Sequence, residues 1–347
     1  MPSEVVRVFC LDVGQGDATV IVGPQQGAAI IVDARQPEPI LNVLREHGIS
    51  RIPVALLTHD DHDHIAGFAA VLREFLHGMQ GTVDIVAYDA DRLPMSGAFG
   101  RQLALLGMLC LPEGPLGPRT FQPCTPTTND RFLSAMLRGT CVATILYPSK
   151  LEVDFLARSG LPRKGRRMRQ RPRSRPNEAS AILMLEWAGH RMLLGADLGA
   201  LGWTILSREQ GHSLRADVFR FPHHGGRFSR TKLQDQMISQ AGLLETVSPS
   251  TVILSVGTGN SHGHPDPDTI RAICSRGNAR LLCTEATGLC LCSGHQEPAA
   301  QHRGAVPCAG TVTVTLGPGS MPVVLPSEEA HNRIIDGFAC PACSRRG

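Results

Sequence analysis

The stretch "LLTHDDHDHIAG", residues 56–67, places three His and three Asp at the six consecutive positions 59–64. It overlaps the end of the apolar run "VALLT" (54–58), which is short and bounded in the manner of a fully buried strand. Ionisable groups crowded at the end of a buried strand repel one another or lose hydration unless a cation compensates them. Imidazole nitrogen and carboxylate oxygen bind divalent metals, so the stretch predicts a metal site. The alternative is a solvated loop whose Asp residues cap a helix.

Three further stretches carry the same side-chain types to the ends of other apolar runs. "LLGADLG" contributes Asp197, "FRFPHHGG" contributes His223 and His224, and "SVGTGNSHGHP" contributes His262 and His264. A core His or a helix-capping Asp would explain any one of these stretches, but not all of them together. Several strand ends that carry ligand types therefore predict one convergent site.

The composition is that of an ordinary globular chain of 347 residues, with 42% hydrophobic and 19% charged residues. No apolar run approaches the ~18 residues that a membrane span needs. The N-terminal "MPSEVVRVFCLDV" lacks the basic and apolar regions of an export signal. We therefore expect a cytoplasmic protein without a membrane partner, and its oligomeric state is unknown.

Periodicity predicts an α/β protein. Runs of strands come first, and strands then alternate with helices, which suggests two sheets with helices outside. Strands are expected at 5–13, 18–22, 28–34, 54–58, 83–89, 180–187, 191–197, 216–221, 251–256 and 279–284. Helices are expected at 38–48, 65–79, 229–241 and 267–276.

The ordered set of motifs resembles a known superfamily. "DVGQGDA", "THDDHDHIAG", "LLGAD", "FPHHGG", "SVGTGNSHGHP" and "CTEATG" look like the metallo-β-lactamase superfamily. Within it, they are most similar to the hydrolase domain of the bacterial DNA-uptake protein ComEC and its free-standing relatives. The resemblance implies an αββα sandwich with a metal site at the sheet edge. We expect this domain over residues 1–310, with an insertion near 90–178, and a C-terminal strand with a Cys-containing tail over 311–347.

The resemblance also implies roles for individual residues. It implies the metal ligands His59, Asp61, Asp63, His64, Asp197 and His223, with His224 as the less favoured alternative to His223. His59 and Asp61 would hold one metal, Asp63 and His64 the second, and Asp197 would bridge both. A bridging hydroxide would be the nucleophile, and Asp63 could orient it. Asp63, Asp197 and His264 would be the catalytic residues; His264 would protonate a leaving group or bind phosphate, unless it is a surface loop residue.

Two departures from the superfamily pattern bear on the metal. Asp61 stands where most of the superfamily has His, and the usual third His of the first metal has no convincing match. An oxygen-rich site moves the expectation from a zinc pair towards Mn²⁺ or Mg²⁺. We expect one or two divalent ions, Zn²⁺ or Mn²⁺, with Mg²⁺ also open.

A basic run precedes the strand that leads to Asp197. Residues 163–175, "RKGRRMRQRPRSR", contain eight cations and no acid, and subtracting these from the net charge of +3 leaves −5 for the rest of the chain. We expect nucleic-acid contact, DNA more than RNA, because neutralised phosphates release counterions; a solubilising linker is the alternative. The contacting residues would be Arg163, Lys164, Arg166, Arg167, Arg169, Arg171, Arg173 and Arg175.

Together these features predict a metal-dependent phosphodiesterase or nuclease, because a two-metal site stabilises the attacking and leaving oxygens of phosphoryl transfer. The resemblance implies that its substrate is DNA. Two alternatives remain open. One is a metallo-hydrolase of a small ester, thioester or amide. The other is a non-catalytic protein that binds metal and a partner.

The 11 cysteines suggest a second metal site. "CPAC" (340–343) has the spacing of half a zinc site. We predict a structural zinc held by Cys290, Cys308, Cys340 and Cys343, with a frayed terminus carrying free thiols as the alternative.

Overall fold

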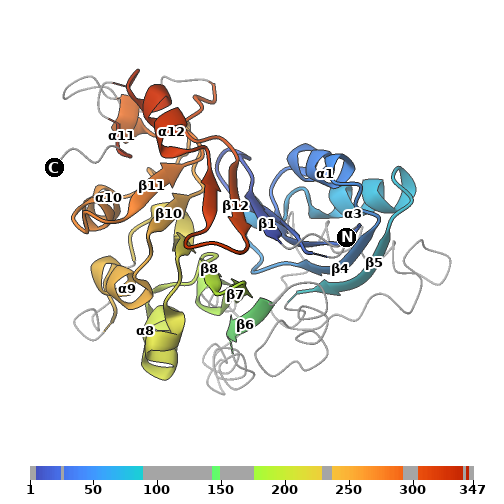
Figure 1. The fold of residues 1–347 in the computed structure, drawn as a ribbon, viewed down its shortest axis with the longest axis horizontal. Helices are drawn as coiled ribbons and strands as arrows, with labels where there is room; N and C mark the ends of the chain where they lie inside the picture. Colours follow the sequence, from blue (N-terminus) through green and yellow to red (C-terminus); the bar gives the residue numbers. More distant parts are fainter. Residues whose placement is uncertain are drawn as a thin grey trace, which may run out of the picture.

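A computed structural model describes residues 5–24, 27–88, 143–148, 176–228, 237–291, 304–338 and 341–343. Within these ranges two β-sheets face each other and helices cover their outer faces (Figure 1). The predicted α/β class and its αββα layering are confirmed. The basic run 163–175 lies outside the described residues.

The two sheets have different strand directions. The first sheet has the spatial order β13 (Val323–Leu325), β12 (Val312–Leu316), β1 (Val6–Cys10), β2 (Ala18–Val22), β3 (Ala29–Ala34), β4 (Arg51–Leu56), β5 (Thr82–Ala87). The second has the order β11 (Arg280–Cys283), β10 (Thr251–Leu254), β9 (Val218–Arg220), β8 (His190–Leu194), β7 (Ile182–Trp187), β6 (Ala143–Tyr147). Strands β3, β4 and β5 are parallel, as are β8, β9, β10 and β11.

Helices form the two outer layers. The described α-helices are α1 (Pro37–Glu46), α2 (His62–Ile65), α3 (Phe68–His77), α8 (Ala200–Gln210), α9 (Gln240–Val247), α10 (Pro267–Cys274), α11 (Gly288–Leu291) and α12 (Glu328–Ile335). Helix α1 buries Ile40, Leu41 and Leu44 at helical spacing, which places them against the first sheet beside α3. Trp203 of α8 and Ile273 of α10 lie in the core that covers the second sheet.

The core between the sheets explains the near-continuous apolar strands. Val32 and Leu56 of the first sheet and Leu183, Leu194 and Ile253 of the second belong to one buried cluster. Strands buried on both faces are apolar at successive positions, because a helix packs on one face and a sheet on the other. The expected strands therefore lie where the apolar runs lie.

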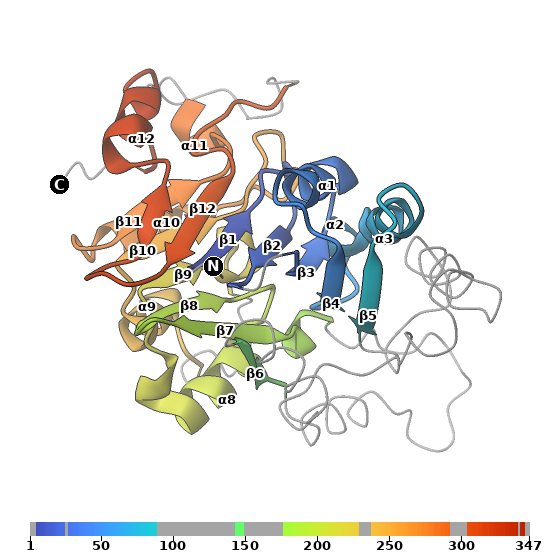
Figure 2. The same ribbon diagram turned by 45° about the vertical axis from the view of Figure 1, so that its right-hand side comes forward.

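The C-terminal segment contributes to the first sheet. Strand β12 pairs antiparallel with β1, from Val6 opposite Leu316 to Cys10 opposite Val312, and the two lie side by side in both views (Figure 2). Residues from the two ends of the chain therefore complete the same sheet. Among the described residues, no helix is both long and apolar enough to cross a bilayer.

One buried ion pair links the two sheets. Arg220, the last residue of β9, donates to Asp17 Oδ1 at 2.7 Å and to Ser255 Oγ at 2.6 Å, and it also contacts Thr19 Oγ1. Arg220 and Asp17 are both buried. The several hydrogen bonds around this pair offset the cost of taking two charges out of water.

Replacing Arg220 by Met should lower the free energy of unfolding by about 3–5 kcal/mol, because it leaves the Asp17 carboxylate buried without its partner. Arg51→Met is the matched control. Arg51 donates to Asp84 Oδ2 at 2.8 Å, but both side chains are partly exposed, so the loss should stay below about 1 kcal/mol. Denaturant titration of both variants measures the difference; equal losses would contradict the structural role of Arg220.

Candidate metal centre

The predicted ligand residues converge at the carboxyl ends of parallel strands. His59 to His64 follow β4, Asp197 follows β8, and the short helical turn η4 (Pro222–Gly225) follows β9. The carboxyl ends of neighbouring parallel strands meet at one edge of a sheet, which is where open α/β sheets bind ligands. Here the edges of both sheets contribute, so stretches far apart in the sequence share one site.

Asp197 lies at the centre of this site. Its Oδ1 is 3.3 Å from His64 Nε2 and 3.6 Å from His224 Nε2. Its Oδ2 is 3.8 Å from His59 Nε2 and 2.8 Å from His223 Nδ1. One carboxylate thus faces four imidazoles, with a different pair at each oxygen, which is the position expected of a bridging ligand.

Asp61 and Asp63 lie close to different imidazoles of the cluster. Asp61 Oδ2 is 3.5 Å from His59 Nε2, and Asp63 Oδ2 is 3.3 Å from His224 Nε2. The ligand atoms of two sets, His59–His64–Asp197 and Asp63–His64–His224, each lie within 4.8 Å of one another. Two overlapping sets of nitrogen and oxygen donors have the composition of a site for one or two divalent ions.

The structure differs from the expectation for the histidine pair. His224, rather than His223, lies against Asp63 and His64 and is buried. His223 is about one third exposed; its Nδ1 lies near Asp197 and 3.2 Å from Asn177 Nδ2. Both histidines have left-handed backbones, with φ of 54° and 52°, and a non-Gly residue in this region is strained. This tight turn brings both rings towards Asp197, so His223 borders the first set instead of completing the second.

A shell of hydrogen bonds orients three of the imidazoles. His64 Nδ1 is 2.7 Å from Asp33 Oδ2, His59 Nδ1 is 3.0 Å from Thr58 Oγ1, and His224 Nδ1 is 2.9 Å from the Ser255 carbonyl. Asp33 Oδ2 also accepts from Thr58 Oγ1 at 2.7 Å, which leaves the hydroxyl free to accept from His59. When each Nδ1 donates its proton outwards, the Nε2 lone pair points into the site.

The atoms that point into the site lack hydrogen-bond partners. Among the described residues, His59 Nε2, His64 Nε2, His224 Nε2 and Asp197 Oδ1 are buried and have no hydrogen bond of good geometry. Buried polar atoms are normally paired. Four orphaned atoms that face one another, each a metal-ligand type, form the arrangement that a cation site requires. The residues therefore fit a divalent metal.

The pKa shifts of the cluster also indicate a site that needs positive charge. Burial alone would lower the pKa of His64 and His224, but Asp197 with Asp33 raises that of His64 well above its usual value, and Asp197 with Asp63 raises that of His224 to about 9. Burial would raise the pKa of Asp197, yet His224 and His64 hold it well below its usual value. The same balance between burial and the imidazoles lowers the pKa of Asp61 and of Asp63. The carboxylates therefore require positive charge beside them, which protons or a metal supplies.

His264 lies beside the cluster without belonging to either ligand set. Its ring centroid is 5.1 Å from that of His223 and 6.3 Å from that of His224, and Asn260 holds its backbone at both N–H and C=O. Burial, together with the neighbouring His223 and His224, lowers its pKa to about 4. At neutral pH this imidazole is therefore uncharged, and it can donate or accept a hydrogen bond. His262 is exposed.

The turn "GQGD" (14–17) packs against the backbone of the metal motif at Asp63. A side chain on Gly16, whose φ is +136°, would place its Cβ 2.3 Å from the Asp63 carbonyl oxygen, so only glycine fits there. Next to it, Asp17 N donates to this same carbonyl at 3.0 Å. The turn therefore fixes the backbone that carries Asp63.

The sequence did not single out Asp33. Asp33 is the second-last residue of "AAIIVDA" and of β3, and its backbone has a positive φ of 57°. An Asp close to the end of an apolar strand is the sequence signal that could have identified it. Cys290, Cys308 and Cys343 belong to another cluster, near α11 and α12, and Cys340 and the basic run lie outside the described residues.

The two-sheet architecture and the order of site residues along the chain define a protein with the metallo-β-lactamase fold, as the motifs predicted. Two curated proteins are similar to this chain in sequence. ComE operon protein 3 of Bacillus subtilis is 22% identical over 301 residues, which cover 81% of this chain and 32% of that protein. Hydroxyacylglutathione hydrolase of a Synechococcus species is 32% identical over 90 residues, which cover 26% of this chain and 33% of that protein.

The chain thus spans about a third of the length of the curated relatives it matches. Among solved structures, the metallo-β-lactamase fold protein YhfI from Bacillus subtilis aligns with 77% of this chain and 93% of its own, with a TM-score of 0.42 and 8% identity. No family model matches the chain.

Asp33→Asn should weaken divalent-metal binding about 10–100-fold, because an amide cannot replace the carboxylate oxygens that orient His64 and Thr58. Asp217→Asn is the matched control: Asp217 Oδ2 accepts from Arg191 N and lies 3.7 Å from His190 Nδ1, outside the cluster. Calorimetric titration with Mn²⁺ gives both affinities. An unchanged affinity in Asp33→Asn, or the same loss in Asp217→Asn, would contradict the orienting role.

Proposed function

We propose that this chain is a metal-dependent hydrolase that cleaves phosphodiesters, with DNA as its substrate. The observation that carries the proposal is the buried cluster in which Asp197 faces oriented imidazoles whose Nε2 atoms have no partners among the described residues. His59, Asp61 and Asp197 would hold one ion, and Asp63, His64, His224 and Asp197 the other. A bound divalent ion supplies a Lewis acid that activates water and neutralises the charge that develops on the attacked phosphate.

The chain's own residues prepare the site for this reaction. Asp33, Thr58 and Ser255 hold three imidazoles in fixed orientations. Preorganised groups cost no reorganisation when charge develops in the transition state, which is the main source of electrostatic catalysis. Asp63 is partly exposed and borders the cluster, so its second oxygen can orient a water molecule.

His264 would contact the substrate. Its neutral imidazole lies beside His223 at the margin of the cluster. It can donate one hydrogen bond to a phosphate oxygen and help to position the substrate for attack. The balance of three carboxylates and three inward imidazoles supports a phosphate substrate, because two-metal sites clamp both oxygens of an in-line displacement.

The test compares two histidines of one motif. His64→Asn should lower kcat/KM for single-stranded DNA at least about 10³-fold, since metal charge stabilisation is worth several kcal/mol. His62→Asn should stay within about threefold of the parent, because His62 is exposed and outside both ligand sets. Equal activity of the two variants would contradict the proposed centre.

The same assay runs a substrate panel with Mn²⁺ or Zn²⁺: single- and double-stranded DNA, RNA, a chromogenic phosphodiester, an acyl–glutathione thioester and a lactam. DNA cleavage is the expected result.

The salt dependence of DNA cleavage should become weaker when the eight cations of 163–175 are replaced by Gln, because fewer counterions are released on DNA binding. The small phosphodiester should be spared by that change; equal loss on both substrates would contradict a DNA-contacting role for the run.

A second candidate is the hydrolysis of an acyl–glutathione compound. The observation in its favour is the 32% identity over 90 residues to a protein named hydroxyacylglutathione hydrolase. Turnover of the thioester alone would select this reaction over phosphodiester cleavage. The concentration of cations in 163–175 favours the phosphodiester.

A further inference from the structure

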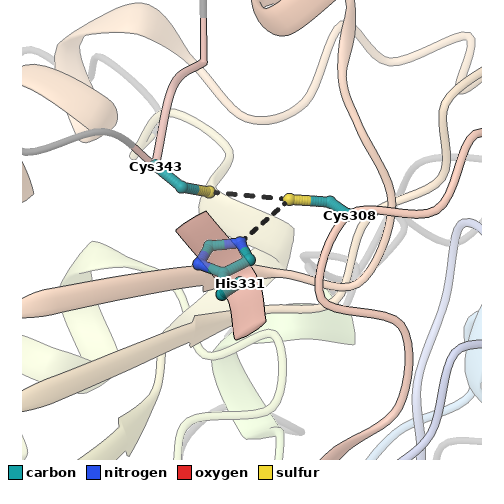
Figure 3. Close-up of side chains that lie close together, drawn as sticks. All are labelled: Cys308, His331 and Cys343. Atoms are coloured by element: carbon teal, nitrogen blue, oxygen red, sulfur yellow. Dashed lines mark hydrogen bonds between the residues drawn. The ribbon is translucent and has the colours of Figure 1, made fainter. Parts of the chain in front are cut away.

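A second group of metal-ligand types lies on the outer face of the second sheet. Cys308, His331 and Cys343 are all buried, and their ligand atoms lie within 4.8 Å of one another (Figure 3). Cys308 Sγ is 3.3 Å from His331 Nε2 and 3.9 Å from Cys343 Sγ. A third sulfur, Cys283 Sγ, is 3.4 Å from Cys343 Sγ.

We propose that Cys283, Cys308, His331 and Cys343 form a structural zinc site. Ligands about 2.3 Å (S) and 2.0–2.1 Å (N) from a tetrahedral zinc lie about 3.5–3.8 Å apart. Three of the six pairs among these side chains, at 3.3, 3.9 and 3.4 Å, lie within a few tenths of an ångström of this range. Cys283 contacts Cys343 but is not one of the three residues whose ligand atoms all lie within 4.8 Å of one another, so its side chain would turn towards the ion on binding. Three thiols and one imidazole make the Cys₃His set of structural zinc sites. The site differs in composition from the metal centre described above, which contains no sulfur.

A disulfide and a catalytic cysteine both fit the cluster less well than a metal ion does. A disulfide needs sulfur atoms about 2.05 Å apart, and Cys343 lies beside two sulfurs, of which it could join only one. A Cys–His nucleophile needs access to substrate, yet Cys308 is only 1% exposed and His331 2%. A bound ion uses all four side chains at once.

The four ligands come from four separate segments of the chain. Cys283 ends β11, Cys308 lies on the segment that returns to β12, His331 is on α12, and Cys343 follows it in the described segment 341–343. Backbone hydrogen bonds already link Cys308 to Thr284 and Ala309 to Cys283. An ion would tie the last helix and the segment after it to the edge of the second sheet, where binding free energy becomes folding free energy.

The predicted zinc site of the tail is thus revised in its members. Cys308 and Cys343 remain, whereas Cys290 Sγ accepts from Ala342 N at 3.4 Å and lies 3.6 Å from Thr287 Oγ1. Cys340 lies outside the described residues. His331 and Cys283 replace these two; His331 belongs to no motif singled out in the sequence, and Cys283 begins "CTEATG", which gave no sign of a zinc ligand.

Cobalt substitution tests the proposal on the full chain. Thiolate ligands give Co²⁺ a charge-transfer band in the near ultraviolet, and a tetrahedral site gives intense visible bands; a nitrogen and oxygen site gives no thiolate band. We expect the band to saturate at one Co²⁺ per chain and to disappear on addition of Zn²⁺. It should be lost in Cys308→Ser and Cys343→Ser and retained in Cys10→Ser, which removes a buried cysteine of the first sheet.

His331→Cys keeps the test decisive if the serine variants do not fold. It should bind Co²⁺ through four thiolates, and its charge-transfer band should be stronger than that of the parent. Four results would each overturn the proposal. The folded parent could show no thiolate band, or the band could be unchanged in Cys308→Ser and Cys343→Ser. The band could also be unchanged in His331→Cys, or mass spectrometry could find a disulfide at Cys343. None of these outcomes depends on hydrolase activity.

Discussion

The buried Asp197 carboxylate, surrounded by imidazoles, is the constraint on which the site depends. A charge taken out of water between two sheets is costly unless opposite charge lies against it. Two imidazoles near each oxygen of Asp197 provide that compensation in one of two forms, as protons on the rings or as metal between them. Because a metal needs deprotonated ligands, the two forms compete. The polar side chains that follow the neighbouring strands lie together at one edge of the sheets, where each can compensate the charge of another.

The fold was largely predictable because strands that are buried on both faces are apolar at successive positions in the sequence. Runs such as "VALLT" and "TVILSV" are apolar at successive positions, and β4 and β10 overlap them. Helices α1 and α10 lie within a few residues of their predicted ranges for a similar reason, since one face of each is apolar. Helix α9 begins at Gln240, near the end of the predicted helix 229–241, of which residues 229–236 lie outside the described residues.

The sequence motifs predict residues that the structure brings together, but they do not predict how these residues are arranged. The stretch from His59 to His64 stands out by composition, because it places three His and three Asp directly after a buried strand. By contrast, the choice between His223 and His224 depends on the left-handed backbone conformation of both residues. The conformational preferences of the local sequence do not predict that turn. Asp33 and His331 act through contacts with residues far away in the sequence. Such contacts exist only after the sheets and helices have packed, so composition and spacing alone do not reveal them.

Anomalous diffraction from crystals grown with Mn²⁺ or Zn²⁺ tests the central claim most directly. We expect one or two peaks, each within about 2.0–2.3 Å of Asp197 and of at least one of the inward Nε2 atoms of His59, His64 and His224. The contradicting result is a site without a peak at saturating metal, in which His64 and His224 remain in direct contact with Asp197. In that case protons alone would neutralise the carboxylate, and the cluster would be a structural ion-pair network.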